Sequence, residues 1–346
     1  MHMADALLSP AVGGAMWLAS AATLALCARQ LRARADNHLV PLMGVLGAFV
    51  FAAQMVNFAI PGTGSSGHLG GGLLLAVLLG PQAAVIVIAS VLTVQALLFA
   101  DGGLLALGAN IFNLGVLPCL SWALVYRPLA ATVATAVPRF RVTLAAVLAA
   151  VVGLQLGALA VVLQTVGSGI ASLPLQSFML MMLPIHLPIG LVEGFATAAL
   201  VLFIRRAQPE LLPALAPSVA PAASFRRTRR RLLGALAGAT VLTGGLLSWF
   251  ASAAPDGLEW AVERVAGARP PLAAQAGLHG RLGEVQAWTS VLPDYRLPEP
   301  LAPADAAVEA AWPAVEPGTS LAGLVGGGVT LLLVAAVTAL LRRRRR

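Results

Sequence analysis

Long apolar runs narrow the fold of this chain more than any other feature. Runs of about 20 apolar residues, the length of a helix that spans a hydrocarbon core, lie at 9–28, 39–60, 82–100, 104–126, 142–166, 176–204, 232–252 and 320–341. A shorter run, 68–80, has the length of a tilted or re-entrant helix. Only 10% of the residues are charged, against about a quarter in soluble domains. The sequence therefore predicts an all-α polytopic membrane protein.

The positions of the arginines indicate which loops face the cytoplasm. All 22 basic residues are arginines, and most of them lie at 29–38, 127–141, 205–231 and after residue 341. If all nine runs cross the membrane, these segments lie on one side, and loops rich in basic residues stay in the cytoplasm. We therefore expect an inner or plasma membrane protein with its amino terminus outside and its carboxyl terminus in the cytoplasm.

The same pattern divides the chain into two modules. Residues 1–204 hold seven of the runs and form a predicted seven-helix bundle, and residues 205–231 form a basic cytoplasmic linker with four prolines. Residues 232–346 form a two-helix module whose helices flank an acidic outer segment, 253–319. We expect this outer segment to be mostly extended or loosely helical, and His38 and His279 to be solvated.

Two histidines are predicted to meet at the outer face. The chain begins MHMADALLSP without a recognisable cleavable signal, and His68 follows the loop PGTGSSG at the outer end of a run. The Met1 amine, the His2 amide nitrogen and the His2 imidazole can form fused chelate rings, and His68 would add a fourth nitrogen. Four nitrogens in a plane suit Ni²⁺ or Cu²⁺, then Co²⁺, whereas Zn²⁺ prefers a tetrahedron. The alternatives are a chance histidine and a merely flexible glycine-rich loop.

Further polar residues gather toward the same outer side. They are Gln54, Asn57, Gln95, Asp101, Asn110 and Asn113. The three-residue spacing predicts that Gln54 and Asn57 share one helix face, and that Asn110 and Asn113 share another. Polar groups inside a membrane need partners, so these side chains either join helices by hydrogen bonds or orient His2 and His68, a role for which Gln95 and Asn113 rank highest. His186 and Glu193 share a helix face at depth, where structural pairing or partner docking is favoured over metal ligation.

Missing residue types exclude several functions. Without lysine the chain has no P-loop, so it is not an ATPase, and any ATP-driven step belongs to a partner. A stand-alone transporter or channel would need acids along a pore, where only Glu193 and Asp101 are available. An intramembrane metalloenzyme would need an open metal position and a general base at depth. We expect neither an enzyme nor a permanently bound cofactor, and partners in the lipid membrane rather than nucleic acid.

Several motifs, in order, resemble one known family. MHMADALLSP, VNFAIPGTGSSGHLGGGLLLAVLLGP, QALLFADGGLLALGANIFN and HLPIGLVEG resemble the substrate-binding component of cobalt and nickel energy-coupling factor transporters over residues 1–204. PDGLEW at 255–260 and LPDYRLP at 292–298 resemble the small accessory subunit of the same transporters, fused here at the carboxyl end.

The resemblance implies a seven-helix protein that binds the transported ion through Met1, His2 and His68, with Ni²⁺ favoured over Co²⁺. It also implies two kinds of partner, a transmembrane coupling protein and a pair of cytoplasmic ATPases. One departure is Met3, where relatives more often carry isoleucine. A methionine at this position leaves open whether translation starts at Met1 or at Met3.

Overall fold

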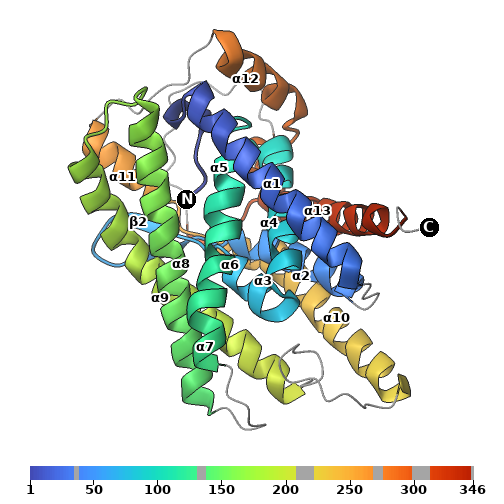
Figure 1. Cartoon of the computed structure of the whole chain (residues 1–346). Helices are drawn as coiled ribbons and strands as arrows, with labels where there is room; N and C mark the ends of the chain where they lie inside the picture. Colours follow the sequence, from blue (N-terminus) through green and yellow to red (C-terminus); the bar gives the residue numbers. More distant parts are fainter. Residues whose placement is uncertain (35–38, 131–137, 208–221, 268–275, 298–311, 344–346) are drawn as a thin grey trace.

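The structure is a computed structural model that describes the chain except residues 35–38, 131–137, 208–221, 268–275, 298–311 and 344–346 (Figure 1). Among the described residues, six helical segments are long and apolar enough to cross a membrane. They are α1 (Pro10–Arg34), α4 (Pro81–Phe99), the segment Leu107–Ala130, α8 (Arg139–Ser168), α9 (Leu175–Ala207) and α13 (Pro317–Arg343). The predicted fold class, an all-α polytopic membrane protein, is confirmed.

The segment Leu107–Ala130 is continuous but not a uniform α-helix. Its α-helical parts are α5 (Leu107–Ile111), α6 (Leu117–Ser121) and α7 (Arg127–Ala130). Two π-helical turns, Phe112–Val116 and Trp122–Tyr126, lie between them. Such turns occur as short insertions within α-helices, so the segment stays one continuous helix. It ends at Ala130, a few residues beyond the predicted run 104–126.

Three predicted crossings are shorter or less apolar than expected. Helix α2 (Leu39–Gln54) has 16 residues and ends well before residue 60. Helix α3 (Gly72–Leu79) has 8 residues, all buried, and so extends only about 12 Å. Helix α10 (Ala222–Gly245) begins in the arginine-rich stretch. Helix α3 corresponds to the run 68–80, expected to be a tilted or re-entrant helix, and it is too short to cross a hydrocarbon core on its own.

A β-hairpin that the apolar pattern did not predict separates α2 from α3. Strand β1 (Phe58–Ile60) pairs antiparallel with β2 (Ser65–Gly67). The turn between them contains Gly62 at φ 77° and Gly64 at φ 72°, conformations that glycine adopts without a steric penalty. The hairpin places His68 directly after β2, at the start of the tight segment that leads into α3.

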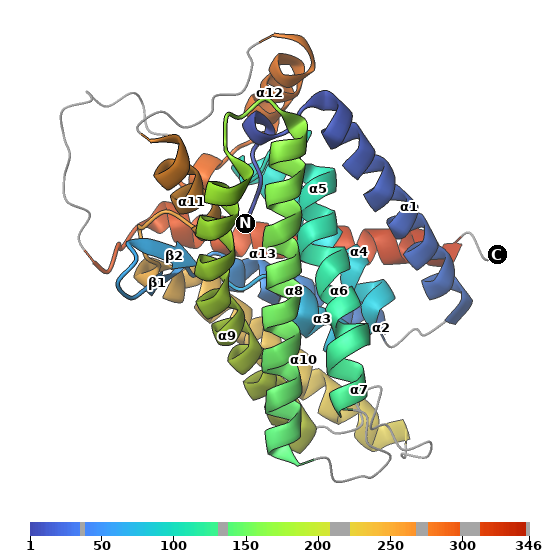
Figure 2. The same ribbon diagram turned by 60° about the vertical axis from the view of Figure 1, so that its left-hand side comes forward.

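Helices α8 and α9 form the longest contact in the bundle and run side by side in both views (Figure 2). Glycines on α9 allow this close approach. A Cβ atom added at Gly194 would lie 2.4 Å from Val147 Cα, and one added at Gly190 would lie 2.9 Å from Val151 Cα. Small residues commonly bring backbones together in membrane bundles.

The carboxyl-terminal module packs on the bundle. Helix α13 contacts α2, α4 and α10, and α10 also contacts α2. The described part of the outer segment contains α11 (Gly257–Ala266), α12 (Gly277–Thr289) and the 3-10 turn η6 (Pro293–Tyr295). Of the two expected forms, extended or loosely helical, the described part is therefore largely helical, and Asp256 caps α11 through a capping box.

His279 on α12 also differs from its prediction as a solvated residue. It is 9% exposed, and its Nε2 lies 2.8 Å from the carbonyl oxygen of Leu8. Helix α12 thus covers the beginning of the chain. His38, the other histidine expected to be solvated, lies outside the described residues.

Candidate metal-binding site

The first residues of the chain run as an ordered segment into the interior of the protein. Met3 is fully buried, and its backbone is held on both sides by Asn110. The Met3 N–H donates to Asn110 Oδ1 at 2.8 Å, and Asn110 Nδ2 donates to the Met3 carbonyl at 3.1 Å. The Ala106 N–H donates to Asp5 Oδ1 at 2.9 Å. The segment therefore has a fixed course beside the connection between α4 and α5.

This course brings His2 next to His68. The centroids of the two imidazole rings are 5.1 Å apart, and the rings are nearly parallel at 14°. The Nδ1 of His68 lies 3.1 Å from the carbonyl oxygen of Leu69, which can only accept, so Nδ1 carries the proton and Nε2 keeps a lone pair. Burial, together with the charges of the Met1 ammonium and His2, lowers the pKa of His68 to about 3. The ring is therefore neutral, as a metal ligand must be.

Asp101 is the predicted polar residue that contacts His2. Its Oδ1 lies 2.9 Å from His2 Nδ1, and His2 Nε2 is buried without a partner among the described residues. Burial raises the pKa of the Asp101 carboxyl, but the contact with His2 outweighs burial and lowers that pKa to about 2. In this structure the Asp101 carboxylate therefore holds the His2 ring through its Nδ1.

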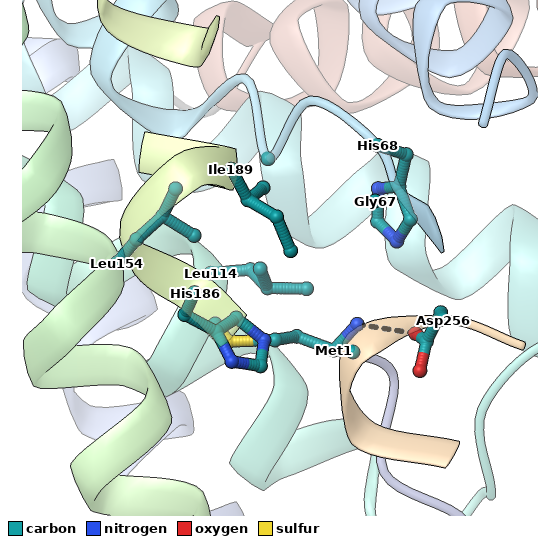
Figure 3. Close-up of a pocket in the computed structure, with 10 residues that line it drawn as sticks. Met1, Gly67, His68, Leu114, Leu154, His186, Ile189 and Asp256 are labelled. Atoms are coloured by element: carbon teal, nitrogen blue, oxygen red, sulfur yellow. Dashed lines mark hydrogen bonds and ion pairs between the residues drawn. The ribbon is translucent and has the colours of Figure 1, made fainter. Parts of the chain in front are cut away.

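The Met1 amino group lies at a small pocket between the bundle and the carboxyl-terminal module (Figure 3). Met1, His68, His186 and Asp256 are among the residues that line this pocket. The amino group donates to Asp256 Oδ2 at 2.6 Å. His186 Nδ1 lies 2.7 Å from the carbonyl oxygen of Met182, and His186 Nε2 has no partner among the described residues. The pocket is therefore lined by the amino terminus, two imidazoles and one carboxylate.

The two predicted glutamines, Gln54 and Gln95, support the backbone that follows His68 indirectly. Gln95 Nε2 donates to Gln54 Oε1 at 2.8 Å, and Gln54 Nε2 donates to the carbonyl of Gly70 at 2.8 Å. The two amides thus form a chain from α4 through α2 to the backbone two residues after His68.

Asn113 and Asn57 lie in other surroundings. Asn113 exchanges hydrogen bonds of 2.8 and 3.0 Å with Gln164 and contacts the Met3 sulfur. Asn57 lies beyond the end of α2, so it does not share a helix face with Gln54, and its carbonyl accepts from the Ser252 N–H. Within the described part of the chain, neither asparagine therefore has a hydrogen bond to His2 or His68.

Glu193 binds backbone amides rather than His186. Its two carboxylate oxygens accept from the N–H groups of Gly70 and Gly71 at 2.8 and 3.1 Å. Glu193 therefore fixes the segment between His68 and α3. A Glu193→Gln substitution keeps one acceptor and leaves one buried N–H without a partner, so we expect it to lower the free energy of unfolding by about 1–3 kcal/mol. Titration with SDS in mixed micelles measures this difference, and Glu263→Gln, at an exposed position of α11, is the control, expected to change little.

Side chains alone do not form an evident metal site in the described residues. Among them, no group of three His, Cys, Asp or Glu side chains is placed to hold an ion. Main-chain nitrogens, the amine of Met1 and the amide of His2, are further potential donors. Met1 is 5% exposed, and it lines the same pocket as His68.

Three residues near the site were not predicted as parts of it. Met3 is held by Asn110, Asp256 contacts the Met1 amine, and Tyr295 donates its hydroxyl hydrogen to Asp101 Oδ2. Asp256 and Tyr295 belong to the PDGLEW and LPDYRLP motifs, which were available as signals of a familiar module. Nothing in the spacing of these motifs indicates that Asp256 reaches Met1 or that Tyr295 reaches Asp101.

The fold and the pocket together define a polytopic helical membrane protein with a nitrogen-rich site next to its amino terminus. Residues 2–211 match the family described as cobalt uptake substrate-specific transmembrane region, and residues 230–343 match the PDGLE domain. The chain belongs to this cobalt uptake family, with a PDGLE domain at its carboxyl end.

Individual relatives match large parts of the chain. A putative fused nickel transport protein NikMN of Archaeoglobus fulgidus is 33% identical over 298 residues, 86% of this chain and 89% of its own length. The fused nickel transport protein NikMN of Rhodobacter capsulatus is 35% identical and covers 85% of this chain and 88% of its own length. A crystal structure of a transition metal transporter matches with a TM-score of 0.53 and 28% identity, over 67% of this chain and 99% of that chain.

Proposed function

We propose that this protein is the substrate-binding subunit of an ATP-driven energy-coupling factor importer for divalent transition-metal ions, with Ni²⁺ favoured over Co²⁺. The ion binds at the outer face through the Met1 amine, the amide and imidazole of His2, and the imidazole of His68. The observation that carries the proposal is the meeting of the amino terminus with two imidazoles whose centroids are 5.1 Å apart. The two nickel transport relatives support Ni²⁺, while the matched family model is named for cobalt uptake.

The ligand arrangement requires one local movement. Only Nδ1 of His2 can close a six-membered chelate ring with the amide nitrogen of the same residue, and that Nδ1 faces Asp101 at 2.9 Å. Ligation therefore needs the His2 ring to turn about its Cβ–Cγ bond, away from Asp101. Four nitrogens then surround the ion in a plane, which suits Ni²⁺.

The proposed partners are a transmembrane coupling protein and two cytoplasmic ATPases. They supply the ATP-driven step, for which this lysine-free chain has no P-loop. The amino terminus lies outside and the carboxyl terminus in the cytoplasm, an orientation supported by the arginines at 29–38, 127–141 and 205–231.

Nickel binding by the purified full chain tests the site. We expect one Ni²⁺ per chain with a square-planar visible spectrum, and we expect His68→Gln to weaken binding at least about 100-fold, the upper end of the loss seen for residues that only orient ligands. His38→Gln, in a predicted cytoplasmic loop, is the matched histidine control and should bind like the parent. Equal Ni²⁺ affinity of the parent and His68→Gln would contradict the proposed ligand set.

Transport in proteoliposomes tests the importer against the alternative, a stand-alone transporter or channel. We expect Ni²⁺ uptake only when the coupling protein, the ATPases and ATP are present. Uptake by this chain alone, driven by an ion gradient or by the Ni²⁺ gradient itself, would instead support the alternative.

A further inference from the structure

One acidic side chain of the carboxyl-terminal module contacts the proposed metal site directly. Asp256 Oδ2 accepts a hydrogen bond from the Met1 amino group at 2.6 Å, between residues 255 positions apart. The two side chains are 3% and 19% exposed, so the ion pair is largely shielded from water. Figure 3 shows this pair next to the ring of His68. The positive charge of the Met1 amine lowers the pKa of Asp256 against the opposing effect of burial.

The Asp256 carboxylate is fixed by its own module. Its Oδ1 accepts from the N–H groups of Leu258 and Glu259 at 2.8 Å each, as the cap of α11. Because these two hydrogen bonds hold Oδ1, the carboxylate cannot rotate freely, and Oδ2 stays directed at the Met1 amine. This geometry assigns the two carboxylate oxygens different partners, one in each module.

The backbone around Asp256 is joined to the segment that carries His68. The Ser66 N–H donates to the Pro255 carbonyl at 2.8 Å, and Ser66 forms a parallel bridge with Asp256. A Cβ atom at Gly257 would lie 3.1 Å from His186 Cε1, so glycine allows α11 to approach this close to the pocket. Asp256 and His68 are thus held on one continuous backbone framework.

We propose that Asp256 is a positioning residue of the metal site, which holds the Met1 amine toward the ion from the outer face. This inference rests on the proposed function. A coordinated amine keeps N–H hydrogens, so Oδ2 can continue to accept from it after the ion binds, as carboxylates do for ligating histidines. A divalent ion with one ionised amide carries one net positive charge, and a buried charge needs a partner of opposite sign.

Asp256→Asn separates this role from the capping of α11. Asparagine caps helices about as well as aspartate, so its Oδ1 can still accept from Leu258 and Glu259. Its amide NH₂ replaces Oδ2, cannot accept from the amine and has no charge. We expect the Ni²⁺ affinity of the full chain, measured by competition with a chromophoric chelator, to fall about 10–100-fold, while the visible band of bound Ni²⁺ stays in place.

Trp260→Phe is the matched control on the same helix. It removes the hydrogen bond of 3.0 Å from Trp260 Nε1 to the Thr63 carbonyl, a contact between the same two modules away from the amine. We expect its Ni²⁺ affinity to stay within about twofold of the parent, and both variants to melt within a few degrees of the parent before Ni²⁺ is added.

Three results would overturn the positioning role. They are unchanged Ni²⁺ affinity in Asp256→Asn, an equal loss in Trp260→Phe, and a shifted visible band in Asp256→Asn, which would make the carboxylate a direct ligand. Failure of the parent chain to bind Ni²⁺ at all would instead contradict the proposed function, so the two failures are distinguishable.

Discussion

Adding a single residue before Met1 is expected to abolish high-affinity Ni²⁺ binding. The extension leaves every side chain intact but converts the α-amine into an amide, which can bind a metal ion only after it loses its N–H proton and can no longer pair with Asp256 as a cation. The amine now lies 2.6 Å from Asp256 Oδ2 and is part of a buried segment, so an added residue also lacks space there. We expect a loss of more than about 100-fold, beyond that of a residue which only orients a ligand, measured by metal content and visible absorption.

A one-residue extension after Arg346 is the matched control and should leave Ni²⁺ binding unchanged. If the amino-terminal extension binds one Ni²⁺ with the parent spectrum and this binding depends on His68, the Met1 amine is not a ligand. The unpartnered Nε2 of His186, in the same pocket, would then be the next nitrogen to test.

The largest expected loss of stability comes from Gly194→Ala on α9. The added Cβ would lie 2.4 Å from Val147 Cα and 3.1 Å from the Val147 backbone nitrogen. Neither atom can move away by a change of rotamer, so α8 and α9 have to separate along their long contact. We expect the free energy of unfolding to fall by about 3 kcal/mol, the upper end of ordinary overpacking costs, as measured by SDS titration in mixed micelles.

Gly167→Ala on α8 makes the same chemical change at a position where an added Cβ meets nothing within 4 Å. Alanine has the higher helix propensity, so this variant should be unchanged or more stable by up to about 1 kcal/mol. Equal stability of Gly194→Ala and Gly167→Ala would show that α8 and α9 do not pack as closely as described.

Long apolar runs predicted most of the helices because a span of about 20 residues needs only composition and length to be recognised. Helices α1, α4, α8 and α9 follow their runs closely. The run 68–80 was harder to interpret as a membrane crossing or a buried helix, because apolar residues buried by protein look the same in sequence as residues buried by lipid. All residues of α3 are buried within the fold, which explains how an 8-residue helix can have such an apolar sequence.

The site shows a similar division between local and distant signals. His2 and His68 were recognised from the chelating start of the chain and the glycine-rich loop, and the structure brings their rings together. Their role as ligands stays a prediction. Asp256 was missed because its capping pattern describes only its own helix, whereas its contact with Met1 depends on how the two modules pack. Asn57 was assigned to a helix face because the turn at the end of α2 has no strong sequence signal.

The contact between Met1 and Asp256 also bears on how the protein is made in the cell. The first residues leave the ribosome long before the last ones, and 255 positions separate this pair. Synthesis proceeds at about 5–20 residues per second, so Asp256 is added roughly 13–50 s after Met1. The growing chain therefore inserts most of its helices while the amino terminus still lacks Asp256, and this buried ion pair forms among the last contacts of biogenesis.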